Sequence, residues 1–324
     1  MVNRALAVLL FLAVAGRACL GDDEITNKFG LVIHALGGRR TIRDMVLSTN
    51  TYPGFLPGSV RANLWLSNYF AGFVPGTLAD AVWRGFQTKG RSARIWECLQ
   101  VPKGWPAKPP VLRWNPNNLM WGRKGMTAIS QVWEGPGMVS QFAITALTRR
   151  HGYLLGHAMG PSGLHPEKVG RRIWFCTRDN QVIERKVQLF VTRCVVPGVE
   201  RDYSIALFDA DLPPGIEPMR VADPDKVRQK YLFLPLINKP VFEARQGGYV
   251  SADVPGWDIP ARGGDSGSPK MLPLPDELVF LGGTTTSPPS AEMQEDIDML
   301  SRTAGLDPSK YQMQWVNLDG YPNP

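Results

Sequence analysis

Short stretches of apolar residues, broken by Gly, Pro and Asn, run through the last two thirds of the chain. Short apolar stretches at this spacing are typical of a β-sandwich or a β-barrel. The predicted strands cover residues 126–132, 141–146, 153–155, 172–177, 186–196, 204–208, 231–237 and 278–286. The 33 glycines and 28 prolines also favour a turn-rich β fold over a helical bundle. The pattern therefore predicts an all-β fold from about Trp114 onward.

One helix is expected after these strands, near the C-terminus. Ser290 can cap a helix over residues 290–303, in which Ile297 and Leu300 share one face. Gly305 then ends the helix. Strands followed by a single terminal helix are the arrangement predicted for residues 114–324.

Residues 22–113 show a weaker pattern and are interpreted as an N-terminal extension. Residues 77–80, Thr-Leu-Ala-Asp, are typical of a capped helix start, and apolar residues at 81, 82, 83 and 86 continue it. Prolines at 102, 106, 109 and 110 then indicate a linker before the main domain.

Residues 1–21 have the pattern of an export signal. Arg4 gives a positive start, residues 5–15 form an unbroken apolar run, and small residues precede a cleavage site near Ala18 or Gly21. A buried N-terminal strand or a short anchor is the alternative. Eleven apolar residues are too few for a transmembrane helix, which needs about 20. We expect a secreted or periplasmic protein with no transmembrane segment.

Cysteines add a second alternative for localisation. A lipid anchor on Cys19 would make the protein a membrane-anchored lipoprotein, but Gly16 and Arg17 stand where that signal carries Leu and a small residue.

Export leaves an odd number of cysteines in a compartment that permits disulfides: Cys98, Cys176 and Cys194. One bridge would leave one thiol, and the sequence does not say which pair forms.

The charge of the chain is moderately basic. Removal of residues 1–21 takes away Arg4, Arg17 and no acid, which lowers the net charge from +7 to +5. The excess is spread along the chain and forms no basic block. We therefore expect no nucleic-acid partner.

Residues 264–269 read Gly-Asp-Ser-Gly-Ser-Pro and carry the strongest functional signal. A serine hydroxyl becomes a nucleophile when a base takes its proton and N–H donors stabilise the oxyanion. The flanking glycines allow a tight turn, so that the backbone N–H groups of Gly264 and Ser266 can form an oxyanion hole. A plain glycine-rich turn is the alternative, but a given Gly-Asp-Ser-Gly string arises by chance in about one such chain in a hundred. Ser266 is the predicted nucleophile.

The base must be one of four histidines: His34, His151, His157 and His165. None of them follows Ser266, which excludes the α/β-hydrolase order and leaves the order His, Asp, Ser. His157 follows an apolar strand and lies between Gly156 and Ala158, whose small side chains leave it uncovered. His151 falls in an Arg-rich turn before that strand. We predict His157 as the base and keep His151 as its competitor.

The orienting acid should precede a buried strand, from which its carboxylate can reach the histidine. Asp202 directly precedes the apolar run of residues 203–208 and is the predicted acid. Arg201 beside it could instead neutralise it. Asp209 and Asp211 follow the strand, and we interpret them as solvated turn residues.

These residues together resemble the trypsin-like serine peptidases. Residues 148–157 resemble that family's S/T-P-R-H, strand, A-H segment, in which the second histidine is catalytic. Residues 202–207 resemble its D-I-A/T-L-L strand, and residues 264–269 resemble G-D-S-G-G-P. The 45 residues from His157 to Asp202 suit the family. The likeness extends over residues 114–318 and is nearest to an exported bacterial branch.

The resemblance implies two six-stranded-type antiparallel β-barrels with the triad in the cleft between them. It implies a polypeptide substrate, no cofactor and no metal. Ser268 departs from the family by replacing the second glycine, and Met159 replaces a cysteine found in many relatives. No Ile-Val-Gly-Gly start is present, so activation by a new N-terminal amine that pairs with Asp265 has no support.

The resemblance also places a substrate pocket around residues just before Ser266 and around a later strand. These residues are Pro260, Ala261, Arg262, Thr284, Thr285 and Thr286. Pro260 falls where an acid would select Lys or Arg, so we do not expect that preference. A small or apolar preference is the working hypothesis.

Three other functions compete with a serine endopeptidase. A catalytically silent homologue would bind peptides or a partner, but the triad is complete. A metal hydrolase would need H-E-x-x-H or a close Cys/His cluster, and the sequence has neither. A structural secreted protein would use the Gly-Asp-Ser-Gly string only as a turn.

Overall fold

The structure is a computed structural model, and the following account is confined to part of the chain. It describes residues 76, 78–87, 92–100, 109–130, 132–135, 138–140, 144–157, 159, 162–194, 201–230, 242–245, 248–252, 266–283 and 288–322. The predicted export signal over residues 1–21 and the strand predicted over residues 231–237 lie outside the described residues.

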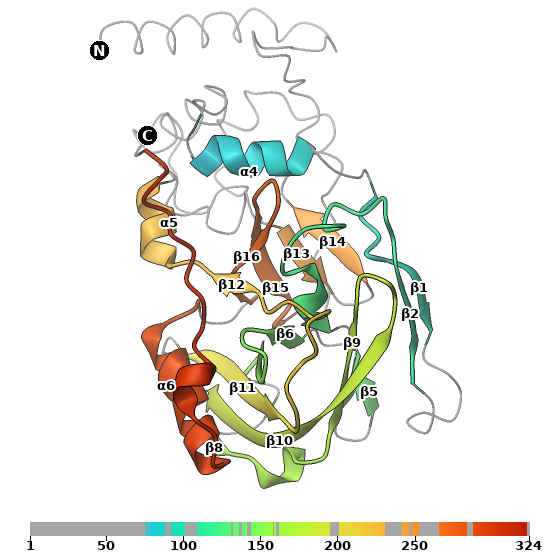
Figure 1. The fold of residues 1–324 in the computed structure, drawn as a ribbon, viewed down its shortest axis with the longest axis vertical. Helices are drawn as coiled ribbons and strands as arrows, with labels where there is room; N and C mark the ends of the chain where they lie inside the picture. The colour runs from blue at the N-terminus through green and yellow to red at the C-terminus, as the bar shows by residue number, and fades with distance from the viewer. Residues whose placement is uncertain are drawn as a thin grey trace, which may run out of the picture.

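The largest sheet of the described residues is antiparallel and has nine strands (Figure 1). Their order is β3-β6-β7-β11-β10-β9-β4-β5, and β8 pairs with β10. The strands are β3 (Ile129–Ser130), β4 (Val132–Gly135), β5 (Met138–Ser140), β6 (Ile144–Ala146), β7 (His151–Leu154), β8 (Gly163–Leu164), β9 (Arg172–Cys176), β10 (Val182–Cys194) and β11 (Asp202–Phe208). The long β10 links the two halves of this sheet because it pairs with β11 at one end and β9 at the other.

A second sheet has five strands in the order β12-β16-β15-β13-β14. They are β12 (Arg220–Val221), β13 (Phe242–Arg245), β14 (Tyr249–Ala252), β15 (Pro269–Pro273) and β16 (Leu278–Gly283). A third, two-stranded sheet joins β1 (Trp96–Gln100) to β2 (Val111–Trp114). The helices are α4 (Leu78–Gln87), α5 (Pro224–Lys230) and α6 (Ala291–Thr303), with 3-10 turns η2 (Met126–Ala128), η3 (Pro166–Lys168) and η5 (Pro308–Lys310).

The prediction of a mostly β protein is confirmed, since strands outweigh helices in the structure. The described sheets are open and are not closed into barrels. No helix within the described ranges has the length and apolar character needed to span a membrane.

One hydrophobic core joins the two larger sheets. The rings of Tyr153 on β7 and Phe280 on β16 meet edge to face with centroids 4.8 Å apart. Both side chains are fully buried. Burial of one large apolar side chain stabilises a fold by about 1.5–3 kcal/mol, so a contact of this kind ties the sheets firmly together.

The segment before Trp114 packs on the same core. The helix predicted from residue 77 is confirmed as α4, whose residues Leu78, Ala81 and Val82 are buried. Gly85 lies against the Pro273 carbonyl of β15 so closely that no side chain would fit. Arg123 is fully buried and donates to the Gly85 carbonyl at the end of α4, and burial lowers the pKa of Arg123 to about 10. Part of the predicted extension therefore folds as one unit with the residues that follow it.

Several element boundaries differ from those predicted. The strand predicted over residues 126–132 starts instead as the η2 turn, because Gly125 adopts a left-handed conformation with φ 78°. β10 begins four residues before the predicted residue 186, where the three consecutive charged residues 184–186 concealed it. The terminal helix is confirmed as α6, but Ser290 at its N-cap makes no side-chain capping hydrogen bond.

Candidate active site

His157 and Asp202 lie side by side although 45 residues separate them in the chain. His157 comes three residues after the end of β7, and Asp202 is the first residue of β11. Asp202 Oδ2 is 2.6 Å from His157 Nδ1. With Nδ1–H donating to this carboxylate, Nε2 is left as the proton acceptor. The His157 side chain is 44% exposed.

The Asp202 carboxylate also binds the backbone beside the histidine. Its Oδ1 accepts the N–H of His157 at 2.6 Å and the N–H of Gly156 at 3.1 Å. A Cβ on Gly156 would lie 2.7 Å from Oδ1 and 2.8 Å from the backbone N of Tyr203. Side chains essentially never approach backbone so closely, so only glycine allows this contact. The acid is thereby fixed against the histidine both through the ring and through the main chain.

Ser266 is half-buried in the turn before β15, on the second sheet. Gly267 has a φ of 81°, which favours glycine. A Cβ on Gly267 would lie 2.8 Å from Leu155 Cβ and 2.9 Å from Leu155 N. Leu155 is two residues before His157, so the serine turn packs on the segment that leads to the histidine. The structure thus brings the motif of the second sheet to the end of β7 on the first.

The remaining predicted site residues lie outside the described residues. They are Gly264 of the oxyanion hole and the pocket residues Pro260, Ala261, Arg262, Thr284, Thr285 and Thr286. Their roles stay predictions.

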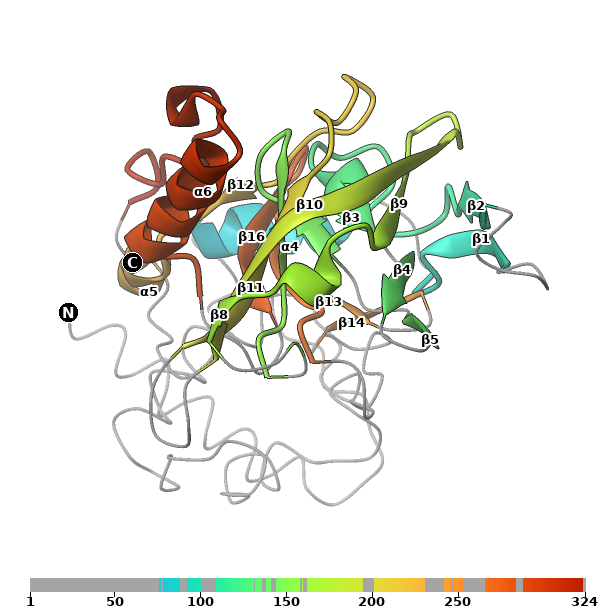
Figure 2. The same cartoon turned by 90° about the horizontal axis from the view of Figure 1, so that it is seen from below.

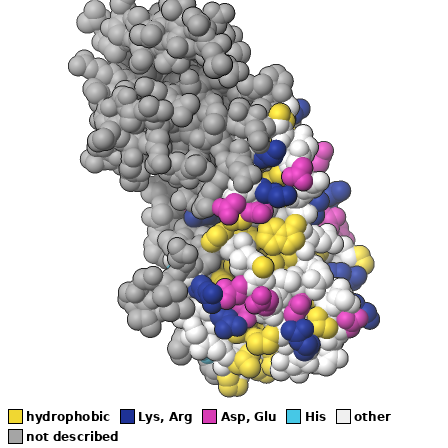
Figure 3. Space-filling model, turned by 90° about the vertical axis from the view of Figure 1, so that its left-hand side faces the viewer, with side chains coloured by type: hydrophobic (Ala, Val, Ile, Leu, Met, Phe, Trp, Pro, Cys, Tyr) yellow, Lys and Arg dark blue, Asp and Glu magenta, His cyan; other side chains and the backbone are white. Residues whose placement is uncertain are grey.

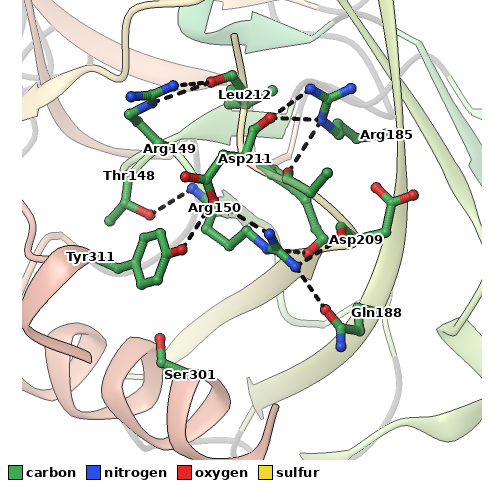
Figure 4. Close-up of polar contacts among 12 residues, drawn as sticks. Thr148, Arg149, Arg150, Arg185, Gln188, Asp209, Asp211, Leu212, Ser301 and Tyr311 are labelled. Atoms are coloured by element: carbon green, nitrogen blue, oxygen red, sulfur yellow. Dashed lines mark hydrogen bonds and ion pairs between the residues drawn. The ribbon is translucent and has the colours of Figure 1, made fainter. Parts of the chain in front are cut away.

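His151 does not lie in the turn before the strand, as the sequence indicated, but begins β7 and is fully buried. Its Nδ1 is 2.9 Å from Thr148 Oγ1, and its Nε2 is 3.3 Å from Ser301 Oγ on α6. Figure 4 shows Thr148, Ser301 and Tyr311 at this end of β7. Burial, aided by the nearby Arg150 charge, lowers the pKa of His151 to about 3. A neutral histidine with both ring nitrogens engaged in the core serves packing and has no access to substrate.

His151 is expected to make stability depend on pH. Its pKa rises from about 3 in the folded protein to about 6.5 in the unfolded chain. As the pH falls from 6.5 toward 3, the unfolded chain takes up a proton that the folded protein does not. The free energy of unfolding therefore falls by up to about 1.4 kcal/mol per pH unit. Urea unfolding at several pH values should show a shallower decline for His151→Gln, and an unchanged decline would contradict this assignment.

Asp209 and Asp211 lie at the opposite end of β11 from Asp202, and both have structural partners. Asp211 is a loop acid whose side chain is 43% exposed, as predicted, but it also accepts from the Tyr311 hydroxyl at 3.0 Å and lies 3.4 Å from Arg150 Nη1. Asp209 Oδ1 accepts the Lys186 N–H at 2.9 Å. Figure 4 shows the Arg150 side chain reaching across this end of the strand toward Asp209 and Gln188.

Arg201, which could have neutralised Asp202, forms an ion pair with Glu292 on α6, and its Nη1 lies 2.5 Å from Glu292 Oε1. The sequence could not reveal this pair, because the two residues are 91 positions apart in the chain.

Cys98, Cys176 and Cys194 are each free and lie on β1, β9 and β10. Cys176 is buried, which raises the pKa of its thiol to about 12. The part of the chain that the structure describes holds no group of three or more His, Cys, Asp or Glu side chains suited to a metal ion.

Acidic and basic side chains are interspersed on the face shown in Figure 3. Ion pairs such as Lys226–Asp319, at 3.2 Å, and Arg178–Glu217, at 3.0 Å, join the two signs across the surface.

Comparison with known protein families found no family model that matches the chain, and comparison with curated proteins found no significant match. Function is therefore inferred from the residues and the geometry of this chain.

Proposed function

We propose that this protein is a secreted serine endopeptidase of the chymotrypsin-like class, with Ser266 as nucleophile, His157 as base and Asp202 as orienting acid. The contact between Asp202 Oδ2 and His157 Nδ1 is the observation that carries the proposal. It selects the histidine tautomer that general-base catalysis requires, and Gly267, next to Ser266, packs on Leu155 two residues before the histidine.

In this mechanism His157 Nε2 takes the proton of the Ser266 hydroxyl as its oxygen attacks the carbonyl carbon of the scissile peptide. The Asp202 carboxylate stabilises the imidazolium that forms. The N–H groups of Gly264 and Ser266 donate to the oxyanion of the tetrahedral intermediate. His157 then gives its proton to the leaving amine, and water releases the acyl group by the same steps in reverse order.

The proposal includes the architecture and the substrate preference of this class. In that class the site lies where two six-stranded-type β-barrels meet, and the open nine-stranded and five-stranded sheets would take the places of the two barrels here. Pro260 stands at the sequence position where an acid would select Lys or Arg, so the proposed pocket of Pro260, Thr284, Thr285 and Thr286 favours small or apolar side chains. Neither a cofactor nor a metal takes part.

A fluorescent organophosphonate probe tests the nucleophile directly. The probe should label the folded wild-type protein on Ser266, as located by peptide mapping. Ser266→Ala should not be labelled. Ser268→Gly, which changes a buried serine in the same turn and gives the sequence G-D-S-G-G-P, is the matched control and should be labelled like the wild type.

Two results would contradict the proposal. Equal labelling of Ser266→Ala would move the nucleophile to another residue. A folded wild-type protein that neither reacts with the probe nor cleaves casein would instead be a catalytically silent homologue that binds peptides or a partner.

A further inference from the structure

A buried carboxylate on α6 lies directly behind the strand that carries Asp202. Asp296 is only 1% exposed. Both of its oxygens lie 3.1 Å from Arg193 Nε, and Arg193 Nη2 donates to Oδ1 at 2.5 Å. The Tyr203 hydroxyl donates to Oδ2 at 2.8 Å. A charge buried to this extent is tolerated only with such partners, so the three side chains hold each other in one geometry.

These partners are immediate neighbours of the proposed catalytic acid. Tyr203 follows Asp202 in the chain and faces Arg193 across the ladder of β10 and β11. The next cross-strand pair is Cys194 with Asp202. Asp296 therefore binds both residues of the Arg193–Tyr203 pair, which lies next to the pair that contains the acid.

The residue on the other side of Asp202 is also bound to α6. Arg201 pairs with Glu292, which precedes Asp296 by one helical turn. Figures 1 and 2 both place α6 beside β10 and β11. One face of α6 thus binds the residues on both sides of Asp202.

A third contact fixes the end of β10 opposite Asp202. Ser162 Oγ accepts the Cys194 N–H at 3.1 Å and donates to the Cys194 carbonyl at 2.5 Å. The Asp202 carboxylate is closely packed, because there is no space for an added carbon on Gly156 beside Oδ1. A displacement of the strand end would therefore change the distance to His157.

We propose that Asp296, acting through Tyr203 and Arg193, is a positioning residue that sets the alignment of Asp202 with His157, and that Glu292 assists through Arg201. This inference rests on the proposed function. Asp296 does not touch the reacting atoms. Its role is to keep the acid at the separation from the histidine ring that proton transfer requires, since misplacement of a catalytic group by about 1 Å can cost about 100-fold in rate.

The charge state of the network suits this role. Burial, together with the nearby Asp296 carboxylate, raises the pKa of Tyr203, so its hydroxyl remains a donor. The hydrogen bond to Asp296 raises the pKa of Arg193. Tyr203 therefore stays neutral and Arg193 stays positive across the pH range in which a histidine base works.

Tyr203→Phe removes only one hydroxyl and is the main test. The expected result is a kcat lowered about 10-fold with an unchanged KM, because substrate does not touch the network. The low-field proton NMR signal of the His157 Nδ1–H, which reports the bond to Asp202, should shift or broaden. Glu292→Gln, which is half-buried and easily tolerated, should lower kcat by about threefold.

Tyr311→Phe is the matched control, because it removes another tyrosine–aspartate hydrogen bond at the far end of β11. It should leave kcat and the NMR signal unchanged. If Tyr203→Phe and Glu292→Gln also leave both unchanged, and lower only the unfolding midpoint, Asp296 is merely structural and the inference is wrong.

The NMR signal is also recorded in Ser266→Ala protein, where no hydrolysis is needed. A shift caused by Tyr203→Phe in that background supports the positioning role even if the wild-type protein has no peptidase activity. Loss of the proposed function and loss of the positioning role are thereby told apart.

Discussion

His157→Ala is expected to lower kcat for peptide hydrolysis by about 10⁶-fold, as much as Ser266→Ala. The members of a triad act as a unit, because the serine hydroxyl is a poor nucleophile when no base takes its proton. The 44% exposure of the His157 side chain predicts that its removal leaves the fold intact. The measurement is the initial rate of casein cleavage by purified protein whose unfolding midpoint has been checked.

His151→Gln is the control for this experiment. Glutamine can still hydrogen-bond to Thr148 and Ser301, and the side chain at 151 lies in the core, away from the proposed substrate site. Most of the activity should remain at neutral pH. An inactive His151→Gln protein together with an active His157→Ala protein would reverse the assignment of the base.

Asp202→Asn is expected to lower kcat by about 10⁴-fold. Asparagine has nearly the same shape, but its amide N–H₂ can donate to Nδ1 and so favours the tautomer with the proton on Nε2, which cannot accept from the serine. KM should change little, because the carboxylate binds His157 and Gly156 and not the substrate. Steady-state kinetics on a peptide substrate separate the two parameters.

Asp209→Asn and Asp211→Asn are the matched controls, because both residues lie in the loop that follows the other end of β11. Both acids hold structural contacts at the far end of β11, so their amides should cost stability and leave kcat nearly unchanged. Full activity of Asp202→Asn combined with a crippled Asp211→Asn would show that the acid has been misassigned.

Local sequence patterns predicted much of the secondary structure. Capping residues and apolar spacing located α4 and α6, and short apolar runs located β9 and β11. The pattern failed where tertiary contacts decide the structure. β10 begins at Val182 because its charged residues pair along an exposed edge with β9, which an apolar run does not reveal.

The contact between His157 and Asp202 could be predicted because each residue carries a local signal. Gly156 leaves space beside the histidine, and an apolar strand follows the acid. The network of Asp296 has no such signal. Its partners lie 93 and 103 residues away in the chain, and an aspartate in the middle of an amphipathic helix is indistinguishable in sequence from a solvated one.

The contacts of α6 with both neighbours of Asp202 also determine when the acid can be aligned during synthesis of the chain. During synthesis, His157, Asp202 and Ser266 are all added to the chain before residues 291–303. A nascent chain can therefore hold all three residues and still lack the helix that aligns the acid. Under the proposed function, the acid is therefore aligned only once α6, one of the last described elements to be made, has formed.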